Sequence, residues 1–241
     1  MFLRTTWLCL AVFGASAVPI YAQDLTAGVG DIKVVSSADH IDFLVKGKLV
    51  GRYECGPMVA KPYLWPLSSP AGVPITRDWP MEAGEAGGSR DHVHQKSAWF
   101  CHGDVIPEGI ELKDKVKGVT GVDFWSEAKG HGVIVCTSRG LVTFTGGKEA
   151  RIVTHNEWRT VEGTKILDED RVIHFQPFDD AYLFTFDIDL AATAAPITFG
   201  DTKEGSFGIR INDALREQGG KGKLTNADGK TGERQVWGMK S

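Results

Sequence analysis

The sequence predicts an all-β protein, a large antiparallel β-sandwich. Short segments of alternating apolar and polar residues recur along the chain, separated by turns rich in glycine, proline and charge. No long helical period appears, and only residues 212–218 favour a short helical turn. With 241 residues, 42% of them hydrophobic, the chain can form one large domain with a substantial core. Evenly spaced strands of this kind are typical of a sandwich, with an open barrel or a cupin-type jelly roll as the alternative.

Residues 1–22 have the layout of a secretory signal peptide. A single cation, Arg4, precedes an apolar run and an exit of small residues. We expect cleavage after about Ala22, which leaves one domain, residues 23–241, secreted or periplasmic. The apolar run is shorter than a membrane-spanning helix requires, and no later segment is longer, so no stable membrane span is expected.

Charge and cysteine content exclude several classes of function. Loss of Arg4 removes one of the 27 cations, against 31 anions, and no basic stripe with interleaved aromatics appears. We therefore expect no nucleic-acid partner. Cys55, Cys101 and Cys136 remain after the signal, and their odd number and wide spacing indicate neither a disulfide framework nor a zinc knuckle. A bridge between Cys101 and Cys136 stays open.

The hydrophobic pattern places strands along the whole domain. A hairpin is predicted to turn at Lys46-Gly47-Lys48, and a longer one at residues 177–180. His155 and Glu157 fall on a charged face that we expect to be exposed to water. The predicted strands cover residues 41–45, 49–54, 97–101, 122–125, 133–136, 141–144, 151–160, 165–175, 181–190, 197–201, 207–211 and 233–240.

Residues 56–89 are predicted to form a long surface loop, because six prolines interrupt any strand pattern there. Tyr63, Trp65 and Trp79 lie in this loop. Flat aromatic side chains of this kind suit stacking on sugar rings, and they equally suit pinning the loop to the core. The loop leads directly into the most unusual segment of the chain.

That segment, residues 90–104, contains three of the seven histidines of the chain. His92 and His94 would point the same way in an extended backbone, and His102 would pair with Asp104 in the same manner. Imidazole is the side chain best suited to proton transfer near neutral pH, so we expect a functional site here, with Asp91 at its edge. The alternative is a set of structural, hydrogen-bonded histidines. Fewer than three metal ligands can be identified by spacing, so no metal and no cofactor is expected.

A second candidate group follows residue 200. Asp201, Lys203, Glu204 and Arg210 concentrate opposite charges among small residues. The group suits an anionic or polar ligand, and it equally suits a surface turn held by ion pairs.

Several separate motifs together resemble an exported bacterial family labelled methane oxygenase PmoA. The motifs are Asp91-His92-Val93-His94, residues 99–104, Val122-Asp123-Phe124-Trp125, Asn156-Glu157-Trp158 and residues 199–210. The resemblance covers about all of the domain, and it implies a galactose mutarotase-like β-sandwich. Similar members carry His-x-His-His, whereas this chain has Gln95 at the last position. Members also continue beyond the position of Trp237, so a C-terminal part of the family is expected to be missing.

This resemblance and the histidines lead to three functional hypotheses. The first is an exported carbohydrate-active protein of epimerase, lyase or hydrolase type, in which histidines and a carboxylate exchange protons with a sugar or sugar derivative. Its catalytic candidates are His92, His94, His102 and Glu204, and its substrate-binding candidates are Trp65, Asp91, Asp104, Lys203 and Arg210. The second is a non-catalytic glycan-binding module. The third is a metal-dependent oxygenase of jelly-roll type that uses His92, His94 and a carboxylate.

Overall fold

The computed structural model describes residues 24–84 and 87–238, and within them the protein is an all-β sandwich of antiparallel sheets. The predicted signal peptide lies outside the described residues. The strands are β1 (Leu25–Val29), β2 (Ile32–Ser36), β3 (His40–Val45), β4 (Lys48–Glu54), β5 (Tyr63–Leu67), β6 (Ala98–His102), β7 (Val105–Pro107), β8 (Val133–Arg139), β9 (Thr143–Thr145), β10 (Glu149–Arg159), β11 (Lys165–Pro177), β12 (Tyr182–Ala192), β13 (Ile197–Phe199) and β14 (Gly205–Ile209). The predicted fold class is confirmed.

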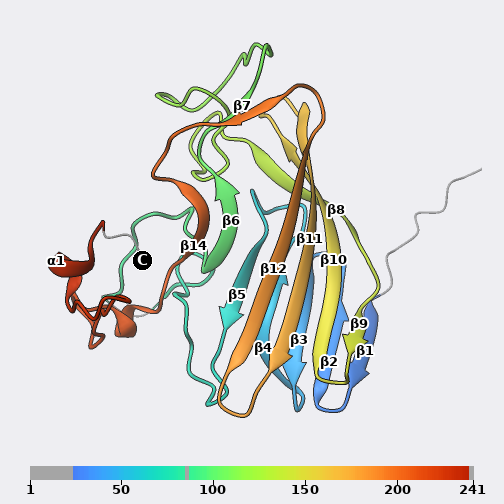
Figure 1. The fold of residues 1–241 in the computed structure, drawn as a ribbon, viewed down its shortest axis with the longest axis vertical. Helices are drawn as coiled ribbons and strands as arrows, with labels where there is room; N and C mark the ends of the chain where they lie inside the picture. Colours follow the sequence, from blue (N-terminus) through green and yellow to red (C-terminus); the bar gives the residue numbers. More distant parts are fainter. Residues whose placement is uncertain (1–23, 85–86, 239–241) are drawn as a thin grey trace, which may run out of the picture.

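Two sheets face each other across the core (Figure 1). The larger has the strand order β1-β2-β3-β4-β5-β6-β14, and the smaller has the order β12-β11-β10-β8 with β9 also paired to β10. A separate two-stranded sheet joins β13 to β7. The pairing of β14 with β6 brings residues 205–209 beside the segment that carries the histidines.

Within residues 24–84 and 87–238, the helical content is confined to two short turns. A 3₁₀ turn, η1 (Asp213–Leu215), is capped by the Asn212 side chain, which accepts a hydrogen bond from the Ala214 N–H. The helix α1 (Glu233–Val236) occupies residues that the sequence pattern predicts as a strand, so that prediction is wrong. It lies beyond β14, on the side away from β1 (Figure 1). No helix in the described part of the chain is long and apolar enough to cross a membrane.

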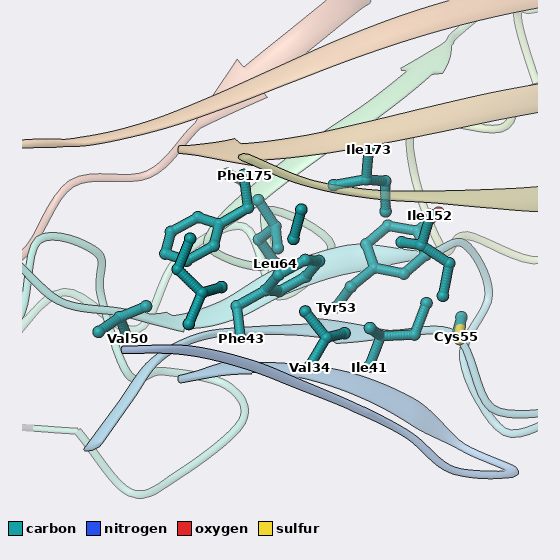
Figure 2. Close-up of a cluster of buried hydrophobic side chains, with 13 residues drawn as sticks. Val34, Ile41, Phe43, Val50, Tyr53, Cys55, Leu64, Ile152, Ile173 and Phe175 are labelled. Carbon is teal, nitrogen blue, oxygen red and sulfur yellow. The ribbon is translucent and has the colours of Figure 1, made fainter. Parts of the chain in front are cut away.

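The core has two clusters of buried side chains. The first fills the space between β2–β4 and β10–β11, where Phe43 and Tyr53 of one sheet meet Ile152, Ile173 and Phe175 of the other (Figure 2). The alternation of apolar residues along these strands places them on the inward face. The second cluster is aromatic and lies around β6, with Trp99 against Trp125 and Phe124 against Trp158.

A buried ionic network crosses the sandwich interior. Glu169 is fully buried and accepts hydrogen bonds from Arg171 Nε at 2.6 Å, Trp158 Nε1 at 2.6 Å and Asn156 Nδ2 at 2.9 Å. Arg171 also donates to the hydroxyl of Tyr53 at 3.0 Å, and so links the two sheets. Because both charges are paired and hydrogen-bonded, their burial is tolerated.

The structure corrects two further details of the predicted strand pattern. The predicted loop at residues 56–89 contains β5, a strand of the larger sheet, although Pro66 lies within it. Residues 122–125 are not a strand, and only Val122 makes an isolated bridge, to Val105. The two predicted hairpins are confirmed as β3–β4 and β11–β12.

Candidate functional site

The histidine segment is a tight turn held in place before β6. His92 adopts a left-handed backbone conformation with φ 45°, and its carbonyl accepts a hydrogen bond from the Gln95 N–H at 2.9 Å. The extended backbone that the sequence suggested is therefore wrong. The turn still brings the two imidazoles together, because the rings of His92 and His94 meet edge to face with centroids 5.5 Å apart.

Two arginines fix Asp91 at the start of this turn. Asp91 Oδ1 accepts from Arg77 Nη1 at 2.9 Å, from Arg210 Nη2 at 2.6 Å and from the Ser89 hydroxyl. Burial opposes ionisation of Asp91, but the hydrogen bonds from Ser89 and Arg77 and the charge of Arg210 outweigh it, so the pKa of this carboxyl lies well below its usual range. Asp91 is thus a permanent anion at the edge of the site.

Arg77 is the positioning residue that the sequence did not reveal. Its side chain is only 2% exposed, and it donates to the carbonyls of Trp79, Ser89, Asp91 and His92. Four carbonyls bound by one guanidinium fix the path of the chain through the turn. Arg77 lies between two prolines in the predicted loop, and a charged residue in such a segment is expected to be exposed.

Arg210, a member of the second candidate group, contacts the histidine segment of the first. It follows β14 directly, and its backbone N–H donates to the Ser97 carbonyl at 2.6 Å. Its side chain reaches Asp91 and also donates to Gln95 Oε1 at 2.9 Å. The glutamine that departs from the His-x-His-His pattern therefore supports the arginine that holds Asp91.

His94 lies among charges from four separate segments. Burial, the Lys61 ammonium and His92 lower the pKa of His94, whereas Glu127 and Glu204 act in the opposite direction. His94 is therefore neutral near pH 7, a state in which imidazole can accept a proton. Glu204, which immediately precedes β14, is close enough to act on the imidazole electrostatically.

Lys61, Lys96 and Glu127 form an ionic group beside His94. Lys61 is 1% exposed, donates to the Trp125 carbonyl at 2.7 Å and lies 3.6 Å from Glu127. Lys96 Nζ donates to Glu127 at 3.0 Å. Burial lowers the pKa of Lys61, which makes its ammonium easier to deprotonate than a surface lysine. The sequence pattern did not reveal this group, although Lys61 lies only two positions before the start of the aromatic strand β5.

The remaining sequence candidates are used within the fold or face solvent. His102 Nε2 is 3.0 Å from the Gly200 carbonyl, and Asp104 Oδ1 accepts the Gly121 N–H at 2.6 Å. Trp65 packs against the aromatic core cluster and donates toward Asp78 at 3.4 Å. The Lys203 side chain is 90% exposed and lies 3.8 Å from Glu204. Among the described residues, none of these four side chains is hydrogen-bonded or ion-paired to His94.

A groove of about 430 Å³ opens beside the Asp91–Arg210 pair. The exposed ring of Trp237 and the charged side chains of Glu217 and Glu233 complete its polar and aromatic lining. Asp91 connects the groove to the histidines, because Asp91 Oδ2 is 3.7 Å from His92 Nε2. An aromatic face beside paired charges and carboxylates is a surface on which a polar ring can stack and be hydrogen-bonded.

Within residues 24–84 and 87–238, no group of three or more His, Cys, Asp or Glu side chains is arranged to hold a metal ion.

The fold and these contacts define an all-β sandwich protein with a histidine turn held by two arginines. Residues 40–241 match the model of a family of unknown function (DUF6807), and the chain belongs to that family. No curated protein and no solved structure matches the chain.

Proposed function

We propose that this protein is an exported carbohydrate-active protein in which His94 exchanges protons with a sugar or sugar derivative. The observation that carries the proposal is the continuity of the site. Asp91 lines the groove and contacts His92 at 3.7 Å, and the His92 ring meets the His94 ring edge to face. The resemblance to the exported PmoA-labelled family, with its mutarotase-like sandwich, supports the same class of substrate.

The charges around His94 support a specific order of proton transfer. A neutral imidazole accepts the proton of a sugar hydroxyl, and the negative charges of Glu204 and Glu127 stabilise the imidazolium that results. The same imidazolium then returns the proton to the ring oxygen or leaving group. This order assigns the base to His94 and makes Glu204 its electrostatic partner.

The groove supplies binding for the rest of the sugar. Trp237 presents an indole that is 82% exposed, as a stacking surface. Arg210 offers guanidinium donors to hydroxyl or carboxylate groups, although Asp91 and Gln95 already occupy part of this capacity. Neutral hexoses and uronic acids are therefore the first substrates to test.

The test combines binding with turnover. Titration calorimetry with hexoses and uronic acids measures binding, and NMR exchange spectroscopy of the bound sugar measures interconversion. We expect Trp237→Ala to weaken binding and His94→Gln to abolish turnover while binding persists. His40→Gln, on β3 in the distant part of the larger sheet, serves as the matched control and should change neither. If no sugar binds at millimolar concentration, the proposal is wrong.

The exposure of Trp237 favours a second candidate, a non-catalytic glycan-binding module. In that case sugars bind with the same dependence on Trp237, but no interconversion or bond cleavage occurs in the wild-type protein.

A further inference from the structure

Two cysteines from opposite sheets meet inside the sandwich. Cys55 directly follows β4 of the larger sheet, and its side chain is 2% exposed. Cys136 lies on β8 of the smaller sheet opposite Asn156, whose side chain is fully buried, and it packs against the first core cluster, to which Cys55 belongs. Figure 2 shows Cys55 at one end of this cluster, beneath Ile152 of the facing sheet.

The two thiols affect each other's ionisation, and a cation lies beside them. The S–H of Cys136 donates to the Ser138 carbonyl at 3.5 Å. The hydrogen bond from Cys55 lowers the pKa of Cys136 to about 7, with help from the Arg139 guanidinium and against the effect of burial. The same contact and burial raise the pKa of Cys55. The two sulfurs therefore have different chemical roles.

We propose that Cys55 and Cys136 form a redox-active dithiol that closes to a disulfide across the two sheets when the protein meets a low-molecular-weight disulfide. Oxidised glutathione is the representative of that chemical class. The inference depends only on the described contacts and not on the proposed carbohydrate site.

The reaction proceeds in two exchanges. The Cys136 thiolate attacks one sulfur of glutathione disulfide, that S–S bond breaks, and a glutathione thiolate leaves while a mixed disulfide forms at Cys136. The Cys55 sulfur then attacks the Cys136 sulfur, and the second glutathione leaves with the proton of Cys55. The protein loses two hydrogens, and one glutathione disulfide becomes two glutathione thiols.

Exposure determines which sulfur reacts first. Cys136 is partly exposed, so a dissolved disulfide reaches it, whereas Cys55 is buried behind it. Cys101 provides the matched control within the same chain. It is fully buried in the second core cluster, and burial raises the pKa of its thiol to about 12. A thiol that is both buried and protonated reacts slowly.

The experiment treats the folded protein without residues 1–22 with oxidised glutathione, blocks remaining thiols by alkylation under denaturing conditions, and analyses tryptic peptides by mass spectrometry. Cys55 lies between Arg52 and Arg77, Cys101 between Lys96 and Lys113, and Cys136 between Lys129 and Arg139, so trypsin separates the three. We expect a Cys55–Cys136 linked peptide and an alkylated Cys101. In Cys55→Ala, modification should stop at glutathione on Cys136, and Cys101→Ala should behave like wild type.

Two results would overturn the proposal: Cys136 of the wild-type protein carrying glutathione with no link to Cys55, or all three thiols remaining free. Alkylation rates of the untreated wild-type protein provide a check that depends on no variant. Cys136 should react at least tenfold faster than Cys101, and equal rates would contradict the assigned roles.

Discussion

The Glu169 carboxylate and the Trp158 indole N–H are joined by a 2.6 Å hydrogen bond in the interior of the sandwich, where both side chains are fully buried. Arg171 neutralises the same carboxylate from the next inward position of β11. Because Glu169 accepts hydrogen bonds from three donors, its buried negative charge is compensated only while all three are present.

Arg171→Met should therefore destabilise the protein strongly. It leaves Glu169 as an uncompensated buried anion, which costs roughly 3–5 kcal/mol of the free energy of unfolding. Urea unfolding followed by tryptophan fluorescence measures the change. The control is Lys165→Met on the same strand, which removes a solvent-screened partner of Asp168 and should change the free energy of unfolding far less. Equal decreases in the free energy of unfolding of both variants would show that the buried ion pair stabilises the protein no more than the surface pair does.

Only glycine fits at position 208 on β14. A Cβ atom there would lie 2.4 Å from the indole of Trp99, which also packs against Trp125. Gly208→Ala should cost roughly 1–3 kcal/mol through overpacking. Gly140→Ala, where the nearest atom to an added Cβ is 3.5 Å away, is the control and should be close to neutral. Thermal denaturation of both variants compares them directly.

The outward face of β10 carries a pH-dependent contribution to stability. His155 hydrogen-bonds Asp170 at 2.7 Å and lies 3.4 Å from Asp168, and these contacts raise the pKa of His155 against the opposing effect of burial. The folded protein thus binds this proton more tightly than the unfolded chain. The stabilisation is fully present below the unfolded pKa of about 6.5 and disappears as the pH rises through the folded value.

Unfolding measurements below and above that window test this expectation. The wild-type protein should lose more stability than His155→Gln as the pH rises from about 5.5 to about 9. Parallel pH profiles for the two proteins would contradict the assignment.

His94 should titrate at lower pH than an ordinary histidine. Burial and the charges of Lys61 and His92 disfavour its imidazolium, so the NMR midpoint should fall below the reference of about 6.5. His94→Gln identifies the resonance by its loss. A midpoint above the reference would remove the basis for assigning His94 as the proton acceptor.

Much of the sandwich was predictable because hydrophobic alternation has a direct physical cause. In β10 the sequence pattern separates Asn156 and Trp158 from His155 and Glu157, and the structure buries the first pair and leaves the second pair on the outward face. The pattern fails where burial is not periodic. β5 includes a proline within a strand, and residues 233–236 form a helical turn with no buried side chain.

The site was predictable only in part, since long-range pairing is invisible in local patterns. The sequence singled out Asp91 and Arg210, and the structure joins these residues, 119 positions apart, in a 2.6 Å ion pair. It gave no indication of Lys61 or Arg77, because a charged residue in a proline-rich segment looks exposed. Only the tertiary structure shows that each is enclosed and bonded to main-chain carbonyls.

The four carbonyl contacts of Arg77 affect how mutational data on this protein should be interpreted. In a saturation screen scored by activity alone, substitutions at Arg77 would be as deleterious as substitutions at a reactive group, although its guanidinium is almost fully enclosed and bonded to the backbone. Scoring cellular abundance in parallel would separate the two kinds of loss. Without the abundance score, a residue that only maintains the fold would be misidentified as a catalytic residue.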